Sequence, residues 1–163
     1  MMDNRVTNIV IAGLGGQGVI RASDIAADAA FRSGFDVKKS EIHGMSQRGG
    51  FVTSDVRFGR QVSSPMVPRG EADYLVVLAP DQLEAVRGSL RPGGVLILPD
   101  GLNGEPLPNK KTLNVALLGI LSTHLPIPEA NWVEAIRSSL PEKFHEANLH
   151  AFQLGRRQAT VHT

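Results

Sequence analysis

The stretch Ile9-Val10-Ile11-Ala12-Gly13-Leu14-Gly15-Gly16-Gln17-Gly18 decides the fold, because it passes from a buried strand directly into a glycine turn. Gly13, Gly15 and Gly18 have the G-x-G-x-x-G spacing, which permits a tight turn, close approach of the backbone to an anion and close helix packing. We expect a helix over residues 17–33, whose first amide groups would face an anion held by the turn. Rossmann-like sheets also keep such a turn for packing alone, so both interpretations stay open.

The composition is that of a soluble protein with one domain, residues 1–163. Hydrophobic residues make up 42% of the chain, charged residues 20%, and the net charge is +1. This balance gives no general attraction for nucleic acid, so we expect no nucleic-acid partner. Residues 1–5 lead into a strand without the pattern of a signal sequence, and no apolar run approaches the roughly 20 residues of a membrane span. We therefore expect a cytoplasmic protein with no membrane partner.

The absence of cysteine is the most restrictive number in the composition. It excludes disulfides, a catalytic thiol and any cysteine-ligated zinc or iron–sulfur centre within this chain. The five histidines include no pair at the i, i+4 spacing of a helical metal site. They are His43, His124, His145, His150 and His162. The sequence therefore predicts no metal ligands.

The order of apolar runs and turns predicts an α/β fold. Continuous apolar runs indicate strands covered on both faces, whereas the alternating run over residues 51–58 indicates an antiparallel or edge strand. Strands are expected at residues 6–12, 35–40, 74–79 and, as another central strand after a turn at residues 91–94, at residues 95–98. Helices are expected at residues 17–33, 80–90, 115–121 with Asn114 as N-cap, 130–140, and from Pro141 onward. The predicted fold is a Rossmann-like three-layer sandwich with a mostly parallel sheet and at least one antiparallel or edge strand.

A second informative segment, residues 40–50, follows the second predicted strand and therefore lies near the carboxyl edge of the sheet, where open α/β folds bind ligands. Arg48 offers a fixed fork of donors for a carboxylate or phosphate, and His43 changes charge near neutrality. Gly49 and Gly50 permit backbone conformations that other residues avoid. Such a loop is also common as plain protein surface, and that alternative remains open.

Together the two segments resemble the gamma-type domain of 2-oxoacid:ferredoxin oxidoreductases. They are Ile11-Ala12-Gly13-Leu14-Gly15-Gly16-Gln17-Gly18 and Glu41-Ile42-His43-Gly44-Met45-Ser46-Gln47-Arg48-Gly49-Gly50. Within that family the resemblance is strongest to the small (beta) subunits that act with indolepyruvate. It continues through Ser64-Pro65, Gly70-Glu71-Ala72-Asp73, Asn114, and Asn148 with Ala151-Phe152, and so covers nearly all of the chain.

The resemblance implies an oxidoreductase subunit for the oxidative decarboxylation of indolepyruvate or a related aryl 2-oxoacid to an acyl-CoA. In the family, thiamine diphosphate with magnesium carries the carbon chemistry, and [4Fe-4S] clusters pass the electrons to ferredoxin. This chain has neither cysteine nor the Gly-Asp-Gly signature of thiamine-diphosphate enzymes. The resemblance therefore assigns those cofactors to a large catalytic subunit, with ferredoxin reached through it. We expect no tightly bound cofactor here, coenzyme A as a ligand, and a homodimer as the alternative assembly of the isolated chain.

Carried over by position, the resemblance implies a crevice whose walls are the glycine turn and the loop that begins at His43. The predicted binding residues are Gly13, Gly15, Gly16, Gln17, Gly18, His43, Gly44, Met45, Gln47, Arg48, Gly49 and Gly50, with His43 and Arg48 as the candidate catalytic residues. Our hypothesis is that Arg48 and the start of the first helix contact a substrate carboxylate or a coenzyme A phosphate, with His43 and Gln47 as hydrogen-bonding neighbours. The alternative is that both loops only fit the large subunit.

Two other functions remain as alternatives. The first is a small stand-alone oxidoreductase that binds NAD(P) or a flavin at the glycine turn. The acid that should bind the ribose, Asp36, comes early in its strand, and too few residues follow for a separate substrate domain. The second is a nucleotide-binding or regulatory module without catalysis. Binding of a dinucleotide by the isolated chain would favour the first alternative.

Overall fold

The computed structural model describes residues 5–43 and 50–161, which form one five-stranded mixed sheet in the order β2-β3-β1-β4-β5. The strands are β1 (Thr7–Leu14), β2 (Asp36–His43), β3 (Phe51–Gly59), β4 (Ala72–Val77) and β5 (Leu90–Ile97). The pairs β1–β4 and β4–β5 are parallel, whereas β3 is antiparallel to both β1 and β2. The strands β1, β2, β4 and β5 therefore share one direction, and their carboxyl ends meet at one edge.

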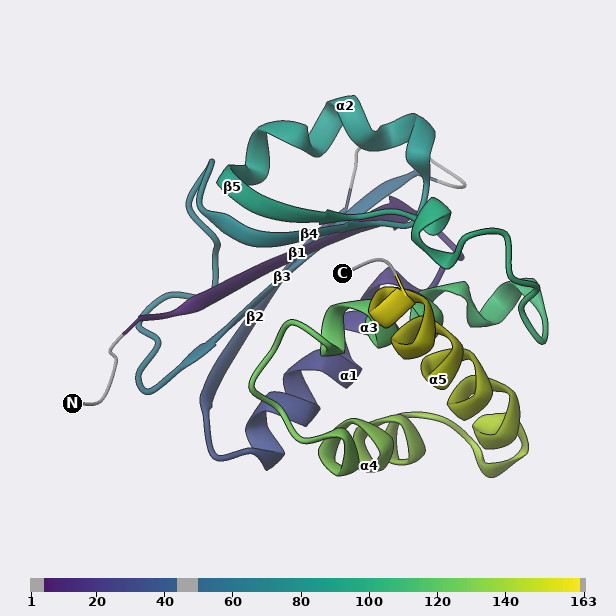
Figure 1. Ribbon diagram of the computed structural model, residues 1–163. Helices are drawn as coiled ribbons and strands as arrows, with labels where there is room; N and C mark the ends of the chain where they lie inside the picture. The colour runs from purple at the N-terminus through teal and green to yellow at the C-terminus, as the bar shows by residue number, and fades with distance from the viewer. Residues whose placement is uncertain (1–4, 44–49, 162–163) are drawn as a thin grey trace.

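Helices cover the two faces of the sheet unequally (Figure 1). The long helices all lie on one face: α1 (Val19–Arg32), α3 (Leu113–Ser122), α4 (Glu129–Ser139) and α5 (His145–Val161). The opposite face carries the short helix α2 (Leu83–Val86), continued at its ends by 3-10 turns at Pro80–Gln82 and Arg87–Ser89. Further 3-10 turns lie at Pro99–Leu102, Lys110–Thr112 and Glu142–Phe144. The predicted α/β fold class, with helices on both faces of a sheet and one antiparallel strand, is confirmed.

Two hydrophobic cores hold the layers together. The larger core lies under α1, where Ala22, Ala26 and Ala29 are buried and let the helix sit close to the strands. The smaller core lies under α2 and includes Leu75 and Val86. These small residues form one stripe along α1, so the helix packs close against the sheet from its start.

Helices α3 and α5 cross at a pair of glycines. The Cα atoms of Gly119 and Gly155 lie so close that a Cβ added to either would fall 3.1 Å from the other glycine's Cα. A Cβ on Gly155 would also lie 2.0 Å from the Ala116 carbonyl oxygen. Helix α3 is buried along nearly its whole length. The close crossing with α5 therefore helps to fix the position of α3 against the sheet.

Two expectations about the strands are wrong. β5 lies at an edge of the sheet and not at its centre, and residues 91–94 belong to the strand instead of forming the turn before it. Apolar composition could not separate these cases, because α2 covers β5 from one side and so supports apolar residues on an edge strand. The Asn114 prediction is also wrong, since Thr112 occupies the N-cap position of α3. None of the described helices combines the length and apolar character that crossing a membrane requires.

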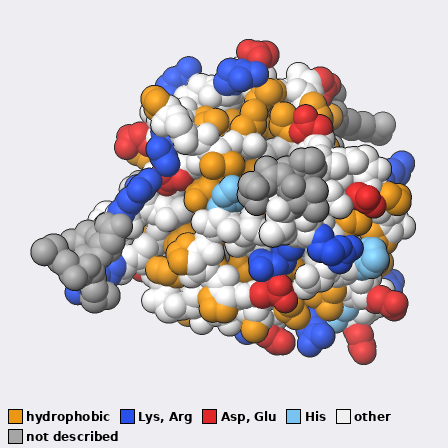
Figure 2. Space-filling view, in the orientation of Figure 1, with side chains coloured by type: hydrophobic (Ala, Val, Ile, Leu, Met, Phe, Trp, Pro, Cys, Tyr) orange, Lys and Arg blue, Asp and Glu red, His pale blue; other side chains and the backbone are white. Residues whose placement is uncertain are grey.

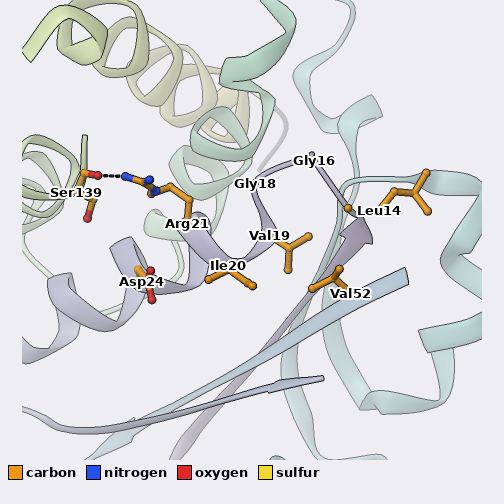
Figure 3. Close-up of a pocket in the computed structure, with 10 residues that line it drawn as sticks. Leu14, Gly16, Gly18, Val19, Ile20, Arg21, Asp24, Val52 and Ser139 are labelled. Carbon is orange, nitrogen blue, oxygen red and sulfur yellow. Dashed lines mark hydrogen bonds between the residues drawn. The ribbon is translucent and has the colours of Figure 1, made fainter. Parts of the chain in front are cut away.

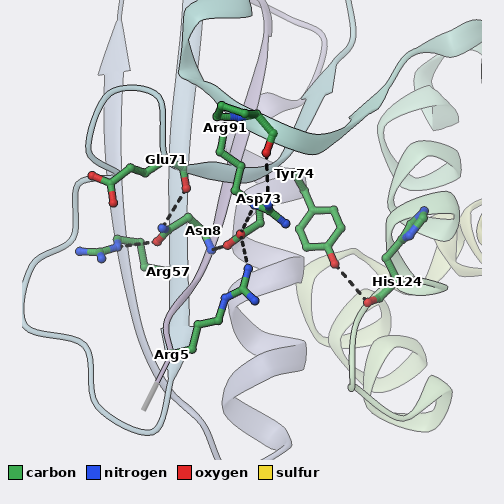
Figure 4. Close-up of polar contacts among 9 residues, drawn as sticks. Arg5, Asn8, Arg57, Glu71, Asp73, Tyr74, Arg91 and His124 are labelled. Carbon is green, nitrogen blue, oxygen red and sulfur yellow. Dashed lines mark hydrogen bonds and ion pairs between the residues drawn. The ribbon is translucent and has the colours of Figure 1, made fainter. Parts of the chain in front are cut away.

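A polar network links the amino ends of the strands β1, β4 and β5 (Figure 4). The buried carboxylate of Asp73 on β4 accepts hydrogen bonds from Arg5 at 2.9 Å, from Arg91 on β5 at 2.7 Å and from the Asn8 backbone amide on β1 at 2.8 Å. Because the two arginines balance its charge, Asp73 is satisfied although it is buried. The network fixes the register of three strands at the edge away from the glycine turn.

Candidate functional site

The glycine turn runs from the end of β1 to the start of α1 and is stabilised from within by Gln17. The side-chain oxygen of Gln17 accepts a hydrogen bond from the Leu14 amide at 2.7 Å, and its amide group donates to the Leu78 carbonyl at 3.4 Å. Gly16 and Gly18 have positive φ angles of 89° and 80°, which glycine adopts without the strain that a side chain would impose. The Gln17 side chain is thus committed to the turn itself.

Asn114 at the start of α3 closes the turn from the far side. Its side-chain amide donates to the Gly18 carbonyl at 3.1 Å, and its oxygen accepts from the Val115 amide at 2.9 Å. A Cβ on Gly18 would lie 2.4 Å from the Asn114 Nδ2 atom, so the contact requires glycine at this position. Sequence reasoning missed this role; the available signal was a polar residue within an apolar helix, which must find a partner when buried.

The two sequence motifs meet at the carboxyl edge of the sheet. The Gly15 amide donates a hydrogen bond to the Gly50 carbonyl at 2.8 Å, which joins the glycine turn to the end of the second motif. His43 is the last residue of β2, and its backbone pairs with Val52 of β3. Residues 44–49 lie outside the described part of the chain, so the contacts of Gly44, Met45, Gln47, Arg48 and Gly49 stay predictions.

A cavity of about 600 Å³ opens beside the turn, at the start of α1 (Figure 3). Gly15, Gly16 and Gly18 form one side, and Val19 and Val52 supply apolar surface. The Arg21 guanidinium reaches across to donate to the Ser139 carbonyl at the end of α4. A helix of 14 residues thus begins at this cavity with its first amide groups and positive dipole end, an arrangement that favours anions.

A charged cluster joins α1 to β2 next to the cavity. The Lys39 ammonium donates to Asp24 on α1 and to Glu41 on its own strand, the latter at 2.8 Å. Burial lowers the pKa of Lys39, but the hydrogen bonds and attraction from the two carboxylates outweigh this, so its pKa lies above the ordinary 10.5. The cluster links α1 to β2, contains two carboxylates for one ammonium group, and leaves Lys39 protonated at neutral pH.

Asp36 does not stand where a ribose-binding acid would stand. It begins β2 at the edge opposite the glycine turn, and its carboxylate accepts a hydrogen bond from the Val62 amide at 2.7 Å. β3 also separates β2 from β1. This geometry argues against an ordinary NAD site of the Rossmann type. The part of the chain that the structure describes holds no cluster of three or more His, Asp or Glu side chains suited to a metal ion.

Comparison with known proteins adds sequence and fold relationships. The model of the family described as pyruvate ferredoxin/flavodoxin oxidoreductase matches residues 8–108. The indolepyruvate oxidoreductase subunit IorB of Thermococcus kodakarensis is 34% identical, over 91% of this chain and 93% of that protein. The alignment spans 194 positions, more than the 163 residues of this chain, so the relative contains insertions.

Solved structures share the fold over nearly the whole chain. The gamma subunit of a keto/oxoacid ferredoxin oxidoreductase from Geobacter sulfurreducens has a TM-score of 0.79 and 25% identity, covering 96% of this chain and 98% of that one. A 2-oxoglutarate:ferredoxin oxidoreductase from Magnetococcus marinus has a TM-score of 0.81 and 22% identity, covering 99% of this chain but 32% of the larger one. The fold therefore occurs both as a separate chain and as part of a longer one.

Proposed function

Because this chain belongs to the pyruvate ferredoxin/flavodoxin oxidoreductase family, we propose that it is the small, cluster-free subunit of an enzyme that oxidises indolepyruvate or a related aryl 2-oxoacid. In the proposed overall reaction, the 2-oxoacid and coenzyme A give an acyl-CoA, carbon dioxide, a proton and two electrons. The carbon–carbon bond to the carboxylate breaks, a carbon–sulfur bond forms, and ferredoxin accepts the electrons. The relationship to the IorB proteins supports the choice of an aryl substrate.

A division of labour between subunits follows from the composition. The chain has no thiolate to hold an iron–sulfur cluster, and it lacks the Gly-Asp-Gly signature for thiamine diphosphate and magnesium. These groups do not fit the residues present, so in this proposal the large partner subunit holds them. This chain contributes shaped backbone, donors for an anion and a docking surface. Ferredoxin is reached only through the large subunit.

The hydrogen bond between Gly15 and Gly50 is the observation that carries the site proposal, because it joins the end of the second motif to the glycine turn that lines the cavity. We place an anionic group against Gly15, Gly16 and the start of α1, with Arg48 as its cationic partner. His43 and Gln47 are the proposed hydrogen-bonding neighbours. The anion is a 2-oxoacid carboxylate or a coenzyme A phosphate; coenzyme A is bound in the Magnetococcus marinus structure.

Reconstitution with the large subunit encoded by the same organism tests the function. The complex should reduce ferredoxin or an artificial acceptor with indolepyruvate and coenzyme A, whereas this chain alone should show no turnover. Turnover of a 2-oxoacid by the single chain, or failure of any cluster-bearing partner to co-purify with it, would contradict the proposal.

The variant Arg48→Ala tests the anion role within that complex. We expect the KM for one of the two anionic substrates to rise about tenfold, the loss of one charge-assisted hydrogen bond, while the complex still assembles. Arg60→Ala, an exposed arginine at the other end of β3, is the matched control and should leave both KM values unchanged. If Arg48→Ala leaves both KM values unchanged, the loops serve only to fit the large subunit.

A further inference from the structure

A second cavity of about 500 Å³ is lined in part by Asn114, the residue that bonds the glycine turn, and its volume suits a small-molecule ligand. The turn Lys110–Thr112, the first residues of α3 and the first residues of α5 enclose it. The side chains that carry the argument are Lys110, Lys111, Asn114, Phe144 and Asn148. Of these, the catalytic proposal above uses none.

One end of the cavity is cationic. Lys110 and Lys111 are exposed, and within the described residues neither side chain makes an ion pair. Their backbone is held in place by Asn109, whose side-chain oxygen accepts from the Lys111 amide at 2.9 Å and whose carbonyl accepts from the Thr112 hydroxyl at 2.7 Å. The described lining contains no Asp or Glu. Two unneutralised ammonium groups on an ordered turn favour a phosphate over a neutral ligand.

Asn148 supplies a buried polar group on the opposite wall. The residue is only 8% exposed, and its side-chain amide donates to the Phe144 carbonyl one turn earlier at 2.9 Å. That bond orients the side chain, and its Oδ1 atom accepts no hydrogen bond from the described residues. The Oδ1 atom remains accessible, because the described buried side-chain atoms without a partner are Ser54 Oγ and Trp132 Nε1. An acceptor on a largely buried residue that opens to the cavity and has no partner among the described residues is available to a donor on a ligand.

An aromatic surface lies beside this acceptor. Phe144 is 46% exposed, and the Lys143 ammonium lies 5.1 Å from its ring centre. Leu140, Val115 and Ala147 continue the apolar lining. A flat aromatic ligand can therefore stack here while its edge reaches Asn148.

From these three features we infer that the cavity binds an adenine nucleotide, with its phosphate at Lys110 and Lys111, its base against Phe144 and its exocyclic amino group donating to Asn148 Oδ1. Asn114 lies in the wall of this cavity and also bonds the Gly18 carbonyl, so a bound nucleotide contacts the residue that closes the glycine turn. The inference does not depend on the oxidoreductase reaction. Coenzyme A contains an adenine nucleotide, but the two proposals can fail separately.

Titration of the isolated 163-residue chain with adenosine 3′,5′-bisphosphate, followed by calorimetry and amide NMR shifts, tests the inference. We expect saturable binding, with the shifts centred on residues 110–115 and 144–148 and not on the turn at residues 15–18. Lys110→Ala/Lys111→Ala should raise the Kd at least tenfold, because both phosphate partners are lost. Phe144→Leu should weaken the nucleotide but not inorganic phosphate. Inosine monophosphate, which lacks the amino group, should bind more weakly than adenosine monophosphate.

The control variant is Lys38→Ala, which removes a half-buried lysine from the edge strand β2, outside the cavity lining, and should leave the Kd unchanged. Asn148 itself is buried and its replacement can unfold the chain, so the lysine pair carries the test. Equal binding of inorganic phosphate and nucleotide, shifts centred on residues 15–18, or equal Kd values for the lysine variant and the control would each overturn the inference. None of these outcomes depends on turnover by the complex.

Discussion

Gly18 satisfies two requirements that exclude every other residue type. Its φ of 80° lies in the left-handed region, and the space beside its Cα is filled by the Asn114 amide. The third glycine of a G-x-G-x-x-G motif is usually explained by packing of the helix on the strand. Here it also receives a side chain from α3, and that contact joins the turn to the second half of the chain.

We therefore predict that Gly18→Ala lowers the free energy of unfolding by about 2–3 kcal/mol. The left-handed conformation costs about 1–2 kcal/mol with a Cβ, and displacing Asn114 loses a hydrogen bond worth about 1 kcal/mol. Urea unfolding measures the change. Gly16→Ala is the control: its φ of 89° imposes the same backbone cost, but a Cβ there meets nothing within 4 Å. An equal loss in both variants would show that Asn114 is not the constraint.

At the scale of elements, the crossing of α3 and α5 depends on backbone contact. Gly155 faces the Ala116 carbonyl, and Gly119 faces the Phe152 carbonyl, where an added Cβ would lie 2.2 Å away. Backbone atoms inside two packed helices cannot move aside as the end of a flexible side chain can. The glycines thus set the distance between these helices, although glycine weakens an isolated helix.

Gly155→Ala should therefore destabilise the protein by about 2 kcal/mol, because an overpacking cost of about 3 kcal/mol exceeds the gain of about 1 kcal/mol in helix propensity. Thermal or urea unfolding gives the measurement. Gly88→Ala serves as the comparison, since its added Cβ would meet only the end of the Arg69 side chain, at 3.1 Å. The close crossing would be refuted by a Gly155→Ala protein as stable as the Gly88→Ala protein.

At the scale of the whole molecule, the buried residue Asp55 links β3 to the segment that leads to β4 through a hydrogen bond. Asp55 is one of the polar residues of the alternating run over residues 51–58, yet it is only 8% exposed and accepts a hydrogen bond from the Val67 amide at 2.8 Å. Burial raises the pKa of Asp55 above its ordinary 3.8, and the Val67 hydrogen bond and the Arg57 charge only partly oppose this. Burial in the folded state therefore disfavours the ionised form of Asp55 relative to its protonated form.

This cost predicts a pH dependence of global stability. Because the folded state holds the Asp55 proton more tightly than the unfolded state, the Asp55 contribution to the unfolding free energy falls as pH rises above 3.8. Asp55→Asn keeps an acceptor for Val67 but does not titrate. The variant should therefore gain stability relative to the native protein between pH 4 and pH 7, as measured by urea unfolding at both values. A relative loss over that interval would show that the ionised carboxylate stabilises the fold.

Local patterns in the sequence were sufficient for the fold class, the glycine turn and most helices. Continuous apolar runs, the small-residue stripe of α1 and the prolines before α4 and α5 act over a few residues, so their consequences can be read without knowing the rest of the chain. The family motifs predicted a crevice between the glycine turn and the loop that begins at His43. The hydrogen bond between Gly15 and Gly50 joins these two segments, and the binding roles of their residues stay predictions.

The order of the strands and the partners of buried polar groups were decided only by tertiary structure. Whether β5 lies at an edge, and whether Asn114 caps its own helix or bonds Gly18, depends on elements far away in the sequence. The second cavity depends on residues 110–115 and 140–148 packing together, and no local pattern encodes that approach. A propensity belongs to one segment, whereas a hydrogen-bond partner or a cavity wall exists only after several segments have packed.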